Sequence, residues 1–219
     1  MPAKILPGND AKITLGASTL IVGCSKFTMS GIARQTIDSS EFGVDADRFV
    51  EGSANPGTIS IADAIYDPGN AVQTAFREAV KDKTRYYHSA LADTTTGLRF
   101  WLDDYTFLTM GTAYSLDEFI MVTKSNDIST ERNGLAKCSI EMQASGGFME
   151  QLTELTVDGE VAAIDTELDV DFIPAYVPQA GTLTDGTTTT TWTAWTGTTF
   201  TIVAPGAVIA DNAVIRLSW

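Results

Sequence analysis

The chain has 219 residues, of which 28 are Asp or Glu and 14 are Lys or Arg, so its formal net charge is −14 at pH 7. Apolar residues make up 44% of it, enough for a hydrophobic core and too many for a disordered protein. Because a strong excess of acid repels phosphate groups, the charge argues against a protein that grips nucleic acid and against one that binds anionic membranes.

In chain order, the sequence begins with expected strands. Two runs rich in Ile, Leu, Val and Thr, at 12–23 and 27–36, predict an opening strand pair. Residues 38–57 carry acids, glycines and Pro56, and are expected to form a long excursion. Residues 58–65 then alternate Ile with Ser and Ala, which predicts a strand with one buried face.

One helix is predicted, at about 70–82. The segment 67–70, Asp-Pro-Gly-Asn, supplies turn and capping residues. A helix of about a dozen residues is too short to be stable alone, so it is expected to pack on a sheet. The apolar residues that recur at helical spacing are Val72, Ala75, Phe76, Ala79 and Val80.

After the helix, strands are expected to resume. A single helix among about seven strands predicts a mainly β (α+β) fold, a sandwich or barrel with the helix packed on it. Asn133-Gly134 marks a turn before the last of these strands. The expected strands lie at 85–92, 98–102, 105–114, 119–124 and 135–144.

The composition changes near residue 150, which divides the chain into an expected body, 1–150, and an expected extension, 151–219. The extension holds nine acids and a single base, Arg216. It is rich in Thr, and its β-branched and aromatic residues favour strands separated by Pro and Gly. We therefore predict a small, acidic, all-β C-terminal extension.

Four acidic residues alternate with apolar ones in this extension: Asp165, Glu167, Asp169 and Asp171. A period of two places their carboxylates on one face of a strand. Calcium needs oxygen ligands that converge, whereas a straight strand spreads them apart. The pattern thus favours an acidic stripe that faces solvent or a lumen over a metal site.

The remaining candidates for chemistry have simple interpretations. His88, the only histidine, stands in a strand-like run without a nucleophile motif, which favours an ordinary strand residue over a catalytic base. Trp192 and Trp195 are expected in the core of the extension, with a sugar-stacking surface as the alternative. We predict no catalytic residue, metal or cofactor, and expect that the chain is not an enzyme.

The cysteines and the N-terminus bear on where the protein folds. Cys24 and Cys138 lie far apart without CxxC spacing, which favours reduced, buried thiols, although a disulfide between them stays open. The N-terminus has no apolar signal core, and no stretch is long and apolar enough to span a membrane. We expect a soluble protein that folds in a cytoplasm and has no membrane anchor.

The order of the features in the first two thirds of the chain carries a family resemblance. An early strand pair leads into the loop 37–52, and Asn55-Pro56-Gly57 then opens a strand. The single helix follows around 71–76, and a late strand, 136–147, closes the series with a Ser-Gly ending. In this order the pieces resemble the major tail tube protein of bacteriophages with long, non-contractile tails. The extension 151–219 departs from that family's basic domain.

The resemblance implies a tail-tube-like β-sandwich subunit of a virion that self-assembles into stacked, hexameric rings forming the tail tube. The implied partners are further copies of the chain, a tape-measure protein, tail-end proteins, and viral double-stranded DNA that transits the lumen during ejection without specific binding. The implied location is the virion tail, after folding in the host cytoplasm. The loop 38–57 would be the inter-subunit element, with candidate residues Phe42, Arg48, Phe49, Gly52, Pro56 and Gly57.

Two other classes of protein stay open at this stage. One is another virion ring component, such as a tail terminator, baseplate or head-decoration protein. The other is a carbohydrate-binding or adhesive module centred on Trp192 and Trp195. In a tube, neighbours would cover the exposed sheet edges of so β-rich a chain, and an acidic wall would let DNA slide without sticking.

Overall fold

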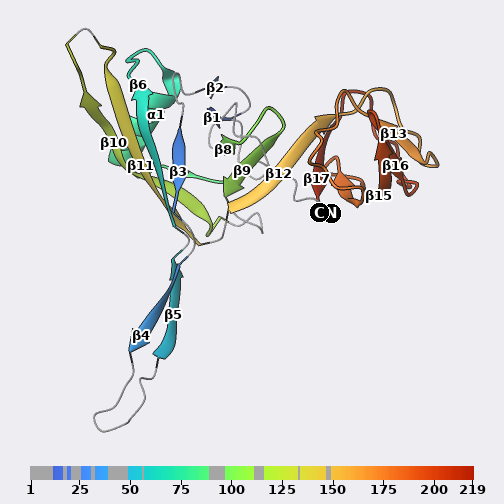
Figure 1. Cartoon of the computed structure of the whole chain (residues 1–219), viewed down its shortest axis with the longest axis horizontal. Helices are drawn as coiled ribbons and strands as arrows, with labels where there is room; N and C mark the ends of the chain where they lie inside the picture. Colours follow the sequence, from blue (N-terminus) through green and yellow to red (C-terminus); the bar gives the residue numbers. More distant parts are fainter. Residues whose placement is uncertain are drawn as a thin grey trace. The chain divides into compact units, whose positions relative to one another are not determined.

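The computed structural model describes residues 12–16, 19–20, 26–30, 33–38, 49–55, 57–88, 97–110, 116–132, 134–146 and 149–219. These residues fall into two compact units. The body comprises the described residues of 12–100 and 109–150, and the C-terminal unit comprises 101–108 together with 151–219. Each unit is built around strands (Figure 1).

The body contains a five-stranded antiparallel sheet, in which the strand order is β3-β6-β11-β10-β7 (Figure 1). Its central strands bury one face, because residues such as Ile61 and Ile140 alternate with exposed polar ones. This is the alternation that the sequence predicts for 58–65. The strands are β3 (Phe27–Met29), β6 (Thr58–Ile65), β7 (Arg85–Tyr86), β10 (Phe119–Ser129) and β11 (Lys137–Ser145).

Helix α1 (Ala71–Asp82) packs on β10 of this sheet. The Asn70 side chain caps it by accepting a hydrogen bond of 3.0 Å from the backbone N–H of Gln73. Phe76 is fully buried, and its ring meets that of Tyr86 edge to face at 5.3 Å. The helix ends at Lys83, whose φ of 57° is left-handed. The prediction of one packed helix in a mainly β fold is confirmed for the described residues.

Further strands complete the body. β1 (Lys12–Leu15) pairs with β2 (Thr19–Leu20), and the strand order continues β9-β8-β1-β2. The Phe27 ring of β3 lies 5.5 Å from that of Phe100, so the two sheets of the body share a core. Strand β8 spans Leu98–Trp101 and β9 spans Thr106–Met110.

The C-terminal unit is a small antiparallel β module with the strand order β13-β16-β15-β14-β17-β12. Trp192 lies at its centre, 1% exposed and 5.5 Å from the Phe200 ring. A Cβ at Gly181 would lie 2.3 Å from the Trp192 ring, so this strand position needs glycine. The strands are β12 (Met149–Thr156), β13 (Glu167–Asp169), β14 (Gly181–Thr184), β15 (Thr189–Thr196), β16 (Thr199–Ile202) and β17 (Val214–Ser218).

Candidate functional site

A two-stranded ribbon extends the β3–β6 pair of the body. β4 (Ala33–Asp38) pairs with β5 (Phe49–Asn55) as a sheet of its own (Figure 1). Met29 pairs with Ile59 and Ala33 pairs with Asn55, so the register of the first pair continues into the second. The β3–β4 and β5–β6 segments therefore form one long hairpin, whose β4–β5 part we call the arm.

The base of the arm is held by backbone and hydroxyl hydrogen bonds. The backbone N–H of Thr58 donates to the hydroxyl of Ser30 at 2.9 Å, and the N–H of Ser30 donates to the Thr58 carbonyl at 2.9 Å. The carbonyl of Gly57 accepts from the Gln143 side chain at 2.9 Å. Gly57 has a φ of 102°, a conformation that favours glycine, so the base of the arm depends on this residue.

The arm contains one irregularity, at Gly52. Arg34 pairs with Ala54 and Thr36 pairs with Glu51, so Gly52 and Ser53 together stand opposite a single residue. This two-against-one arrangement is a β-bulge, and glycine is common at such positions. The prediction that 38–57 is an excursion is therefore wrong for 49–55, because pairing with β4 makes that segment a strand without an apolar alternation.

The six candidate inter-subunit residues fall partly within the arm. Phe49 begins β5, and Gly52 lies at the bulge. Gly57 stands at the base, where β6 begins. Phe42, Arg48 and Pro56 lie outside the described residues.

The four residues of the predicted acidic stripe are all exposed in the C-terminal unit, and the Leu168 and Val170 side chains between them are buried. The regular strand covers only Glu167–Asp169, however. Ile164, which the alternation places on the apolar face, is 84% exposed because it lies in a turn before the strand. In the part of the chain that the structure describes, no group of three or more His, Cys, Asp or Glu side chains is arranged to hold a metal ion.

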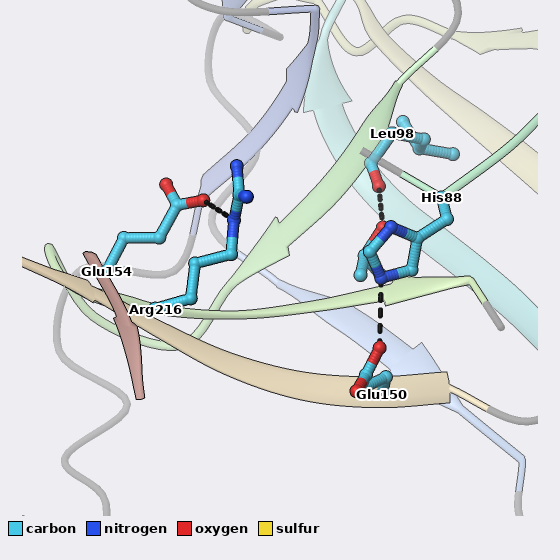
Figure 2. Close-up of polar contacts among 6 residues, drawn as sticks. His88, Leu98, Glu150, Glu154 and Arg216 are labelled. Atoms are coloured by element: carbon cyan, nitrogen blue, oxygen red, sulfur yellow. Dashed lines mark hydrogen bonds and ion pairs between the residues drawn. The ribbon is translucent and has the colours of Figure 1, made fainter. Parts of the chain in front are cut away.

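His88 is buried in the body, where its Nε2 lies 2.9 Å from Oε2 of Glu150 (Figure 2). Burial raises the pKa of the Glu150 carboxyl above its ordinary value. Nearby, the hydroxyl of Thr109 donates to the carbonyl of Leu98 at 3.1 Å. The pair is a polar contact within a packed interior, since the side chain of His88 is only 2% exposed.

The two tryptophans of the extension pack inward rather than forming a flat platform. The indole N–H groups of Trp192 and Trp195 both donate to the carbonyl of Pro178, at 3.2 and 3.0 Å. Trp192 is almost fully buried, and Trp195 is partly buried against the same core. The core interpretation of Trp192 is therefore confirmed, and the alternative of a sugar-stacking pair is wrong for this residue.

Sequence reasoning missed a hollow of about 290 Å³ in the C-terminal unit. We call it the aromatic hollow, because the Tyr105 and Phe172 rings stack in its wall at 5.1 Å. Its residues come from four separated segments, which no local sequence pattern connects. They are Trp101, Asp104, Tyr105, Glu154, Leu155, Thr156, Asp171, Phe172 and Val214.

One carboxylate of the hollow already has a partner. The Nε of Arg216 donates to Oε1 of Glu154 at 2.9 Å, and both side chains are largely buried (Figure 2). Asp104 and Asp171, two further acids of the hollow, are exposed. The hollow thus combines aromatic rings with two solvent-facing carboxylates.

Two further observations concern membranes and thiols. Among the residues that the structure describes, no helix has the length and apolar character needed to cross a membrane. Cys138 is a free thiol in β11 and is 2% exposed, and burial raises its pKa. Cys24 lies outside the described residues.

Comparisons with known proteins find only weak similarity to this chain. No family model matches the chain, and no curated protein matches it. Seven chains of solved structures do match, and one of them belongs to a structure described as the tail of an empty GTA particle with C6 symmetry. That match covers 64% of this chain and 92% of the other, with 18% sequence identity and a TM-score of 0.40.

Proposed function

We propose that the chain is a structural subunit of a phage-type tail, which self-assembles into stacked rings and so builds the tail tube. The observation that carries the proposal is the arm, a ribbon in continuous register with the sheet of the body. It occupies the place of the inter-subunit loop in the ordered series of features that resembles the tail tube family.

The arm needs a partner for physical reasons. A two-stranded ribbon is marginally stable by itself in water, and its outer edges carry unpaired backbone groups. In the described part of the chain, β4 and β5 pair only with each other. A neighbouring copy that packs against the arm would satisfy these edges, and a head-to-tail contact of this kind produces a ring where its rotation closes.

The five-stranded sheet offers a second surface for assembly. β7 pairs with β10 only at Ile120 and Met121, so no described strand lies beside the outer edge of β10 from Val122 to Ser129. An open edge of this length is a template for pairing with another chain. We assign it to a contact between neighbouring subunits of one ring.

The exposed face of this sheet suits the wall of a conduit. Thr28, Ser60 and Glu141 lie side by side on it and are all exposed. The lysines of β10 and β11 lie beside acids, with Lys124 2.7 Å from Asp127 and Lys137 3.6 Å from Asp63. A wall of short hydroxyl groups, an exposed carboxylate and cations that lie beside acids gives DNA phosphates little to bind, which favours passage without specific binding.

The finer parts of the proposal follow from the assembly. The subunit would belong to the virion tail, where six copies form each ring, and would meet a tape-measure protein in the lumen and other proteins at the tail ends. The exposed acidic residues of the C-terminal unit, Asp165 to Asp171, are assigned to solvent or the lumen.

Negative-stain electron microscopy of the purified full-length chain tests the proposal. We expect rings or tubes at high protein concentration. A variant in which a short Gly-Ser linker replaces 33–55 should remain monomeric, because it lacks the arm, whereas Glu160→Gln, an exposed change in the C-terminal unit, should assemble normally. A wild-type chain that stays monomeric, with no ring even in tails, would refute the proposal. Localisation at one tail end alone would assign a terminator or baseplate ring instead.

A further inference from the structure

The aromatic hollow has the chemistry of a site for a cationic side chain. Phe172 is 47% exposed although its ring stacks on Tyr105, so part of the ring is open to a ligand. Two exposed carboxylates, of Asp104 and Asp171, belong to the same hollow. A guanidinium or ammonium group is attracted both by the face of an aromatic ring and by a carboxylate, and its alkyl stem covers apolar surface.

The charge of the unit points to the same class of ligand. Residues 151–219 carry nine acids and one base, and the segment 101–108 adds Asp103 and Asp104. That base, Arg216, already pairs with Glu154. Any partner that fills the hollow therefore approaches a strongly negative surface, which favours a basic partner and disfavours an acidic one.

The body of the chain carries such a partner at the end of α1. We call Arg77, Lys81 and Lys83 the basic end of α1; all three are exposed, as are Glu78 and Asp82, so the segment 77–83 holds three bases and two acids. Within the described residues, none of the three makes an ion pair. Other exposed lysines of the body differ in this respect, since Lys124 and Lys137 have acidic neighbours.

We propose that the aromatic hollow of one copy receives a basic side chain from the basic end of α1 of a neighbouring copy. The inference rests on the proposed self-assembly and adds a specific contact to it. Phe172 provides the ring face, and Asp104 and Asp171 provide the opposing charge. The acidic excess of the C-terminal unit thereby becomes part of an interface between copies of the chain.

Sedimentation velocity of the full-length chain over a range of protein concentrations, at low and high salt, tests this contact. Lys81→Glu with Lys83→Glu should raise the concentration needed for association about tenfold, and Phe172→Ala should do the same. High salt should weaken the wild-type association, because ions screen charges that lie near solvent. Arg132→Glu, at an exposed base outside the basic end of α1, is the control and should leave association unchanged.

A charge exchange separates this contact from a loss of folding. The double substitution Asp104→Lys, Asp171→Lys should by itself weaken association. When it is combined with Lys81→Glu and Lys83→Glu, association should return, because the charges of the two surfaces have been exchanged. Circular dichroism checks that each variant is folded. Recovery of association in the combined variant supports the inference. If the substitutions acted by destabilising the fold, their effects would add and association would weaken further.

The other outcomes are equally decisive. Association that is unaffected by these variants would overturn the contact and leave the proposed tube intact. Association that depends on them but yields dimers, without rings in the microscope, would support the contact and refute the tube. A wild-type chain that does not associate would overturn both. Binding to a polysaccharide array that Phe172→Ala abolishes, with association unchanged, would assign the hollow to a glycan and overturn the contact.

Discussion

The Nε2 atom of His88 lies 2.9 Å from Oε2 of Glu150 inside the body, where the histidine is almost completely buried. The two residues come from segments far apart in the sequence and hold the end of β7 near the start of β12. Burial raises the pKa of the Glu150 carboxyl. The contact therefore contributes to stability in a way that depends on pH.

Glu150→Ala should lower the free energy of unfolding by about 1–3 kcal/mol, because it removes a hydrogen-bond partner of a buried ring. Urea denaturation followed by circular dichroism measures the change. Glu160→Ala is the control, and its effect should stay within about 0.5 kcal/mol because this side chain is exposed. Equal effects of the two substitutions would show that the His88 contact contributes nothing.

The sign of the pH dependence follows from the raised pKa of Glu150. The folded state holds the proton of this carboxyl more tightly than the unfolded state does, so its contribution to stability falls as pH rises above the ordinary carboxyl range. Glu150→Gln should flatten the stability profile on the side above the ordinary carboxyl range, at about pH 4 and higher. A profile that is as steep in the variant as in the wild type would contradict this assignment.

Tyr86 gives a second pH-dependent prediction, at the alkaline end. Burial raises the pKa of its phenol to about 12. The unfolded chain loses this proton near pH 10, so stability should fall as pH rises from about 10 to 12. Tyr86→Phe should remove that part of the loss, as measured by denaturant unfolding at pH 9 and 11. Tyr66→Phe is the comparison, and should leave the alkaline loss in place.

Gly181→Ala should destabilise the C-terminal unit by about 1–3 kcal/mol, because the new methyl group would meet the Trp192 ring. Tryptophan fluorescence during thermal unfolding reports on this core directly. Thr191→Ala, at an exposed position of β15, should change stability far less. An unchanged melting temperature in Gly181→Ala would mean that the ring moves aside at no cost.

Two surfaces are candidates for the lumen: the acidic stripe of the C-terminal unit and the exposed face of the five-stranded sheet. A DNA-ejection assay distinguishes them. We expect neutralisation of the acidic stripe, with Asp165, Asp169 and Asp171 changed to Asn and Glu167 to Gln, to leave ejection unchanged if the stripe faces solvent. Ser60→Lys with Thr28→Lys should slow ejection from assembled particles, because it places cations on the proposed wall. The reverse pattern would assign the stripe to the lumen and remove the sheet from it.

Local sequence signals predicted the helix and the central strand well. Asn70 caps α1, and the apolar spacing that follows it buries Val72 and Phe76. Ile59 and Ile61 alternate with exposed residues in β6, as expected for a strand with one buried face. In each case the pattern lies within one element, so the sequence contains all of the information that the element needs.

The arm and the aromatic hollow depend on contacts between separated segments. β5 has no apolar alternation, and it becomes a strand because β4 pairs with it. Tyr105 and Phe172 stack although many residues separate them, and the alternation that ends at Phe172 does not predict this partner. Ile164 follows the alternation of the stripe, but it lies in a turn before β13 begins at Glu167. It is exposed because the alternation predicts a buried face only for residues within the strand.

The continuous register of the long hairpin limits which insertions and deletions the arm can tolerate. A deletion or insertion of one residue in β4 alone would move every later pair out of step, because strand faces alternate with each residue. Matched changes in both β4 and β5 would preserve every pair nearer the body. Apart from a single extra residue absorbed by a bulge, as at Gly52, the length of the arm should change by equal numbers of residues in the two strands.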